Sequence, residues 1–153
     1  MDTTHVAQLN IGRLHHPLDS DETAEFTNAL GPINALAEAT PGFVWRLQDE
    51  DGQSSSFVRL PGENDPLTIV NMSVWASLES LQHFMFRSGH AMYLRRRREW
   101  FEHSDVATSV CWRIPAGDVP ELADAHRRLL HLREHGPTEI GWPLSKPVDS
   151  QVH

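Results

Sequence analysis

The sequence has little cysteine and no long hydrophobic run. Cys111 is the single cysteine among 153 residues, and one cysteine cannot form an internal disulfide, so we expect a reducing compartment. The polar first residues, Met1–His5, supply neither the basic nor the apolar part of a signal peptide. No apolar run approaches the length of a membrane span. These absences predict a cytoplasmic protein with no membrane partner.

Positive charge is also scarce. The formal net charge is −8, so general attraction to phosphate backbones is not expected, even though four arginines stand together at Arg95–Arg98. The sequence also lacks a P-loop, a dinucleotide-binding glycine motif, a nucleophile elbow and the paired cysteines of a zinc site. It therefore predicts no nucleic-acid partner, no tightly bound organic cofactor and no metal.

The sequence does contain enough hydrophobic residues to form one core. Hydrophobic residues make up 39% of the chain and charged residues 22%, which is typical of one globular domain. We expect this domain to span residues 1–145, with a flexible C-terminal tail at 146–153. The segment 49–66, rich in Gly, Ser, Asp and Pro, is longer than most hairpin loops and is a candidate mobile flap over a site.

Hydrophobic periodicity predicts the order of the elements. Alternating or continuous apolar residues predict strands at 5–13, 43–48, 67–75 and 108–114, with a short edge strand within 138–144. Apolar residues at helical spacing predict helices at about 21–39, 78–88, 89–101 and 122–135. Because Pro32 removes an internal hydrogen bond, we expect a kink at Gly31-Pro32, or two short helices in place of the first one.

This order contains the β-α-β-β-α-β unit of the ferredoxin-like fold, which we expect as an antiparallel sheet with helices on one face. In the strand at 67–75, apolar residues occupy both the odd-numbered and the even-numbered positions, which indicates that both faces of the sheet are covered. A second sheet from another copy of the chain is the simplest cover for the face without helices. We therefore predict an α+β fold that assembles as a dimeric α+β barrel, a homodimer.

Several short motifs occur in order along residues 5–143. They are Leu9-Asn10-Ile11-Gly12-Arg13, Ile33-Asn34-Ala35-Leu36-Ala37, Pro41-Gly42-Phe43-Val44-Trp45-Arg46-Leu47, Val70-Asn71-Met72-Ser73-Val74-Trp75, Arg87-Ser88-Gly89-His90, Arg97-Arg98-Glu99-Trp100-Phe101 and Gly136-Pro137-Thr138. By these motifs the chain resembles a family of uncharacterised bacterial proteins in the dimeric α+β-barrel superfamily. The superfamily includes antibiotic-biosynthesis monooxygenases and haem-degrading monooxygenases, so the resemblance implies a monooxygenase-like oxidoreductase.

The haem-degrading members of that superfamily are similar in one further respect. They place an Asn on the first strand, a Trp at the end of the third strand and a His on the following helical segment, and Asn10, Trp75 and His90 occupy comparable places here. The interval from Trp75 to His90 is longer in this chain. The resemblance implies haem as an alternative cofactor, with His90 as the axial ligand.

His90 is the strongest catalytic candidate. It shares a predicted helix face with Arg97 and Trp100, and an imidazole on a mostly apolar face can act as a general base. A buried histidine bonded to a backbone carbonyl is an equal alternative. Arg97 is a candidate for binding a carboxylate or phenolate, and an internal ion pair with an acid such as Glu99 or Glu102 is its alternative.

Asparagines and aromatic residues complete the candidate site. Asn10 and Asn71 lie on predicted strands, where their amides could polarise a carbonyl or orient dioxygen; hydrogen bonds that fix strand register are the alternative. Small-molecule sites are mostly apolar, so we expect aromatic side chains to line the substrate cavity, although aromatic residues at such positions are often simply core. The candidate substrate-binding residues are Trp45, Trp75, Tyr93, Trp100 and Trp112.

Two other groups are expected to be structural. Cys111 alternates with Trp112 on a core strand, which favours a packed thiol over a nucleophile. His131 and His135 are four residues apart on a helix and could chelate a transition metal, but a third ligand is missing.

Three functions remain open on the sequence. The first is a monooxygenase-like enzyme acting on an aromatic or polyketide-like small molecule, with His90 as base and Arg97, Asn10 and Asn71 stabilising an anion. The second is haem binding or haem degradation with His90 as iron ligand. The third is a non-catalytic dimer, structural or small-ligand-binding, in which these side chains only pack.

Overall fold

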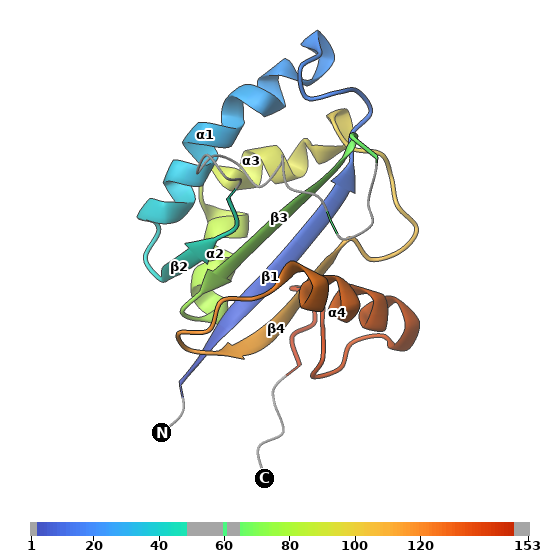
Figure 1. The fold of residues 1–153 in the computed structure, drawn as a ribbon. Coiled ribbons are helices and arrows are strands. Elements are labelled where there is room, and N and C mark those ends of the chain that lie inside the picture. Colours follow the sequence, from blue (N-terminus) through green and yellow to red (C-terminus); the bar gives the residue numbers. More distant parts are fainter. Residues whose placement is uncertain (1–2, 49–59, 61–64, 149–153) are drawn as a thin grey trace.

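A four-stranded antiparallel sheet forms the centre of the structure, a computed structural model that describes residues 3–48, 60 and 65–148. The strands are β1 (Thr4–Arg13), β2 (Phe43–Arg46), β3 (Thr68–Trp75) and β4 (Ser109–Pro115), in the order β2-β3-β1-β4 (Figure 1). This is the strand order of a ferredoxin-like sheet. The predicted α+β class and ferredoxin-like topology are therefore confirmed.

The described residues also form four helices and two short turns of 3-10 helix. The helices are α1 (Ala24–Ala39), α2 (Leu78–Arg87), α3 (His90–Arg95) and α4 (Leu122–His135). The 3-10 turns are η1 (Asp21–Thr23) and η3 (Arg97–Glu99). None of the described helices is long and apolar enough to cross a bilayer.

Helix α1 runs through Pro32 without a break, so the alternative of two short helices is wrong. Gly31 and Pro32 both lie on the exposed side of the helix. Ile33 and Ala37, on the other side, pack into the core under α1. The burial of this apolar side continues across the proline and outweighs the loss of one backbone hydrogen bond.

The predicted single helix at 89–101 is also wrong, because α3 ends at Arg95 and the chain turns. The Arg96 guanidinium binds Glu25 of α1 as well as Glu99, and it lies 4.9 Å from the centre of the Trp100 ring. Phe101 then forms a β-bridge with Leu14, just beyond the end of β1. Contacts to distant parts of the chain therefore end the helix.

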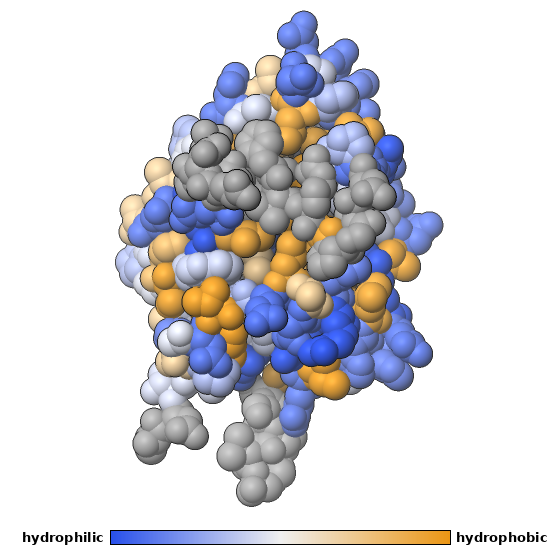
Figure 2. All heavy atoms as spheres, in the orientation of Figure 1, coloured by the Kyte–Doolittle hydropathy of each residue, from blue (hydrophilic) through white to orange (hydrophobic). Residues whose placement is uncertain are grey.

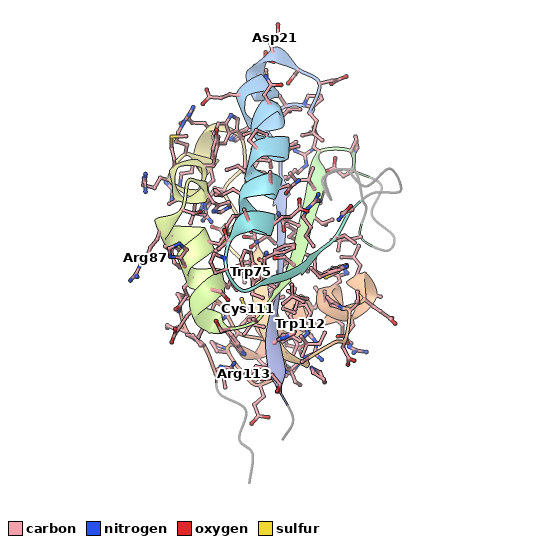
Figure 3. All side chains as sticks on the ribbon, turned by 90° about the vertical axis from the view of Figure 1, so that its left-hand side faces the viewer. Asp21, Trp75, Arg87, Cys111, Trp112 and Arg113 are labelled. Carbon is pink, nitrogen blue, oxygen red and sulfur yellow. The ribbon has the colours of Figure 1, made fainter. Side chains whose placement is uncertain are left out.

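The helices cover both faces of the sheet, so the expectation of helices on one face only is wrong. Helices α2 and α3 lie behind the sheet in Figure 1 and α4 lies in front of it; Figure 3 shows the two sides edge-on. The buried side chains of α4 are Ala125, Leu129 and Leu132, and they pack against Leu9 and Trp112. Hydrophilic residues predominate on the outward surface around α4, with small separate hydrophobic patches (Figure 2).

This arrangement explains why β3 has apolar side chains on both of its faces. Val70, Met72 and Val74 are buried on the side of the sheet where α4 packs, and Trp75 is buried on the other side. Both faces of β3 are therefore covered within one chain, without a second copy. The homodimer stays a prediction.

The expected edge strand within 138–144 is reduced to two isolated bridges, Thr138 with Gly141 and Trp142 with Cys111. Trp142 and Cys111 exchange two backbone hydrogen bonds, of 2.7 and 2.9 Å, alongside β4. The candidate flap at 49–66 and the predicted tail at 146–153 lie largely outside the described residues.

Gly12 leaves the space that the Phe101 ring occupies. A Cβ atom at this position would lie 2.6 Å from Cδ1 of Phe101 and 2.8 Å from Cε1. We expect Gly12→Ala to lower the free energy of unfolding by about 1–3 kcal/mol, because overpacking forces the ring to move. Urea denaturation measures the change.

The matched background is Phe101→Ala, which removes the ring. There, Gly12→Ala should change the free energy of unfolding by no more than about 0.5 kcal/mol. An equal loss in both backgrounds would show that the overlap with Phe101 is not the cause.

Candidate functional site

A cavity of about 500 Å³ lies between the sheet and helices α1 and α3. It opens on the face of the sheet opposite α4. The predicted site residues that line it are Asn10, Asn71, Trp75, His90, Tyr93, Arg97 and Trp100. Four separate elements supply these side chains, so the fold brings together residues that are far apart in the sequence.

Trp45 and Trp112 do not belong to this cavity. Both pack in the core on the α4 side of the sheet, and Figure 3 shows Trp112 and Trp75 on opposite sides of the strands. The reason is the pleat of β4, which points Trp112 to the same side as its alternate neighbours Val110 and Ile114. The expectation that these two tryptophans line the same cavity as His90 is wrong.

The floor of the cavity is a row of hydrogen-bonded polar side chains. Gln8 lies opposite Ser73 in the register of β1 and β3, and its Nε2 donates to the Ser73 hydroxyl at 2.8 Å. The indole Nε1 of Trp75 donates to the same hydroxyl at 2.9 Å. Gln8 and Ser73 are only 6% exposed, so these bonds compensate for the burial of their polar atoms.

The two predicted asparagines continue this row. Asn10 and Asn71 are register partners on β1 and β3. The Nδ2 group of Asn10 donates to Oε1 of Gln8, and Oδ1 of Asn71 accepts from Nε2 of Gln8 at 3.5 Å. Gln8 thus orients both amides, and the Nδ2 group of Asn71 has no acceptor among the described residues.

Gln8 and Ser73 are polar members of the site that the sequence analysis missed. The period-2 pattern of β1 places Gln8 on the same side as Asn10. What the sequence could not supply was the register of β1 against β3, which is needed to bring Ser73 beside Gln8.

His90 begins α3 and lies at the cavity wall. Its Nδ1 is 3.4 Å from the backbone oxygen of Met85. A carbonyl oxygen can only accept, so Nδ1 carries the hydrogen and Nε2 keeps a free lone pair. Burial lowers the pKa of His90, and the hydrogen bond to Met85 offsets only part of this effect. The ring is therefore held in its neutral form, as a base requires.

Aromatic rings form two walls around this polar floor. In the first wall, Trp75 stacks on Phe84 with ring centres 5.0 Å apart, and Phe84 contacts the His90 ring at 4.8 Å. In the second wall, the Trp100 ring lies 6.0 Å from Tyr93 and 5.6 Å from Phe26. Such apolar walls around a few polar groups suit a flat, mostly apolar ligand.

Arg97 has no acidic partner among the described residues, so the ion pair considered as its alternative does not form. Glu99 is bound by Arg96, and Glu102 is bound by Arg13. The Arg97 side chain is exposed and lines the cavity. It is therefore available to bind an anion.

The remaining candidates lie elsewhere. Cys111 is buried among apolar side chains, and burial raises the pKa of its thiol to about 12; the predicted packed thiol is confirmed. The rings of His131 and His135 lie 4.4 Å apart. No group of three or more potential metal ligands of the His, Cys, Asp or Glu type occurs in the described part of the chain.

The pKa of His90 can be measured by following its ring signals by NMR as the pH is varied. We expect a value below the ordinary 6.5, with the hydrogen of the neutral ring on Nδ1, because burial disfavours the imidazolium. Phe84→Ala should raise this pKa by admitting water beside the ring. A pKa at or above 6.5 in the unaltered protein would contradict the environment described for His90.

Comparisons with solved structures find similar folds at low sequence identity. NE2512, a protein of unknown function from Nitrosomonas europaea, aligns with a TM-score of 0.48 and 13% identity over 78% of this chain and 97% of that chain. SnoaB, a cofactor-independent oxygenase from Streptomyces nogalater, aligns with a TM-score of 0.46 and 19% identity over 78% and 100%.

At the level of sequence, no curated protein matches the chain. One family does, and it is described as a domain of unknown function, DUF3291. The match spans residues 5–153, nearly the whole chain. The resemblance to an uncharacterised family is therefore confirmed: the protein belongs to the DUF3291 family.

Proposed function

We propose that the protein is a monooxygenase-like enzyme acting on a flat aromatic or polyketide-like molecule that carries an acidic phenol or an acidic C–H beside a carbonyl. The observation that carries this proposal is the neutral His90 ring at the wall of an aromatic cavity. Its Nδ1 is directed to the oxygen of Met85, which leaves Nε2 as a base at the cavity wall.

In the first step, Nε2 of His90 accepts the acidic proton of the substrate. The negative charge that develops on the substrate oxygen needs hydrogen-bond donors already in place. The Nδ2 group of Asn71 and the guanidinium of Arg97, which have no partners among the described residues, are such donors at the cavity surface. Gln8 holds the amides of Asn10 and Asn71 in orientation, so little reorganisation accompanies the charge.

In the second step, the electron-rich substrate anion reacts with dioxygen. For a CH₂ group beside a carbonyl, the carbon gives an electron pair to dioxygen, and the peroxide formed takes up the proton held by His90. Loss of water then leaves a new C=O group. One oxygen atom of O₂ ends in the product and the other in water, and the substrate itself supplies the electrons.

Haem binding is the second candidate function, and one observation favours it. A neutral imidazole whose Nδ1 is held by a carbonyl is also the form in which histidine commonly ligates a metal through Nε2. Haem added to micromolar protein should then give a shifted Soret band that is lost in His90→Ala. The absence of this band would remove haem as a candidate.

Anthrone tests the oxygenase proposal, because the carbonyl across its central ring acidifies the CH₂ group through the aromatic rings, as a neighbouring carbonyl would. We expect the protein to accelerate oxygen uptake by anthrone and formation of the quinone. His90→Gln should lower kcat/KM by about 100-fold or more, the usual contribution of a general base. An oxygen electrode and the quinone absorbance follow the same reaction.

His83→Gln is the matched control, since His83 lies on the exposed side of α2 and is not among the residues that line the cavity. It should leave the rate unchanged. Equal rates for the unaltered protein and His90→Gln would remove His90 from the chemistry.

A further inference from the structure

The opening of the cavity is positively charged, although the protein as a whole is negative. The charged lining residues among those described, histidines aside, are Arg46, Arg97, Arg98 and Glu102. Glu102 is bound by Arg13, which lies outside the cavity lining. The formal net charge of the whole chain is −8, so the positive lining is a local feature and not a consequence of composition.

Two of these arginines differ from most arginines in the structure. Arg13, Arg96 and Arg128 each bind at least one carboxylate, and so does Arg46, through Glu38. The side chains of Arg97 and Arg98 have no hydrogen-bond or ion-pair partner in the parts of the chain that the structure describes. Both side chains are exposed, so their guanidinium groups are accessible to an anion.

The nearby acids are already engaged. Glu25 and Glu99 both bind Arg96. The acidic groups that could neutralise Arg97 and Arg98 are thus directed to other arginines. Within the described ranges, this distribution of ion pairs leaves the positive charges of Arg97 and Arg98 without a carboxylate.

We propose that the ligand of this cavity is an aromatic carboxylate, or an organic anion of similar shape, whose charge Arg97 and Arg98 bind at the opening. The flat apolar body would lie between the aromatic walls, with its acidic group near His90. Arg97 can supply the one cation that a developing oxyanion needs. Arg98 is a second cation without a partner among the described residues, and it indicates a substrate that already carries a carboxylate beside the reacting group, where Arg98 binds the carboxylate and Arg97 contacts both groups. The location of the reacting group rests on the proposed function, whereas the binding of the carboxylate does not.

Hydroxynaphthoate, a naphthalene with a carboxylate beside a phenol, is the probe for this proposal, and its methyl ester is the uncharged match. Titration calorimetry or probe fluorescence measures both affinities with the full chain. We expect the carboxylate to bind at least about tenfold more tightly than the ester at low salt, with the difference shrinking as salt is added. Equal affinities, or no binding of the carboxylate at millimolar concentration, would overturn the proposal.

Substitutions identify the residues responsible. Arg97→Gln and Arg98→Gln should each weaken hydroxynaphthoate binding by about fivefold, which is the upper range for a single exposed ion pair, and should leave ester binding unchanged. Arg95→Gln is the matched control, because it changes the net charge by the same amount. Arg95 is exposed and does not line the cavity. An equal effect of Arg95→Gln would show a general charge effect and contradict the site.

His90→Gln separates this proposal from the oxygenase. If both proposals hold, this variant binds hydroxynaphthoate normally but does not oxidise anthrone. If the carboxylate binds through Arg97 and Arg98 while the unaltered protein oxidises nothing, the binding proposal stands and the oxygenase falls. If anthrone is oxidised but the carboxylate and the ester bind equally, the oxygenase proposal stands and the binding proposal falls.

Discussion

The hydrogen bonds that meet at the Ser73 hydroxyl fix the part of the sheet on which the candidate site is built. The indole of Trp75 can only donate a hydrogen bond, and Ser73 accepts it in a buried position. With its indole fixed, Trp75 stacks on Phe84, and Phe84 in turn contacts His90. The position of the imidazole therefore depends on a polar contact in the sheet beneath it. Loss of that acceptor would leave buried donors unpaired, at a cost of about 1–3 kcal/mol each.

The two faces of the sheet differ in composition and in structural role. The face under α4 is apolar and packed around Leu9 and Trp112. The opposite face carries the polar row of Gln8 and Asn10 and keeps a cavity beneath α1 and α3. The opposite face also has packed clusters, around Trp75 and Trp100, and the polar groups and the cavity lie beside them. This division explains how a small domain can have both a core and a site.

Much of the fold could be predicted from the sequence, because the strands and most helices follow from periodicity alone. Periodicity gives the side of a helix that is buried but not the face of the sheet it covers, and so α4 was placed wrongly. The end of α3 depends on the ion pair between Arg96 and Glu25, residues far apart in the chain. For the site, His90 and Arg97 were predicted together from one face of a helix over 89–101 that ends at Arg95 in the structure, and both still line the cavity. Placing Ser73 in the site and Trp112 outside it required knowledge of the strand pairing.

The tryptophan indoles provide the most direct test that this cavity is the site. Each of the five tryptophans gives one indole N–H signal in a proton–nitrogen NMR spectrum. Hydroxynaphthoate should shift the signals of Trp75 and Trp100, which line the cavity, and leave those of Trp45 and Trp112 in place on the other side of the sheet. Shifts confined to Trp45 and Trp112, or no shift of Trp75 and Trp100 under saturating ligand, would contradict the account.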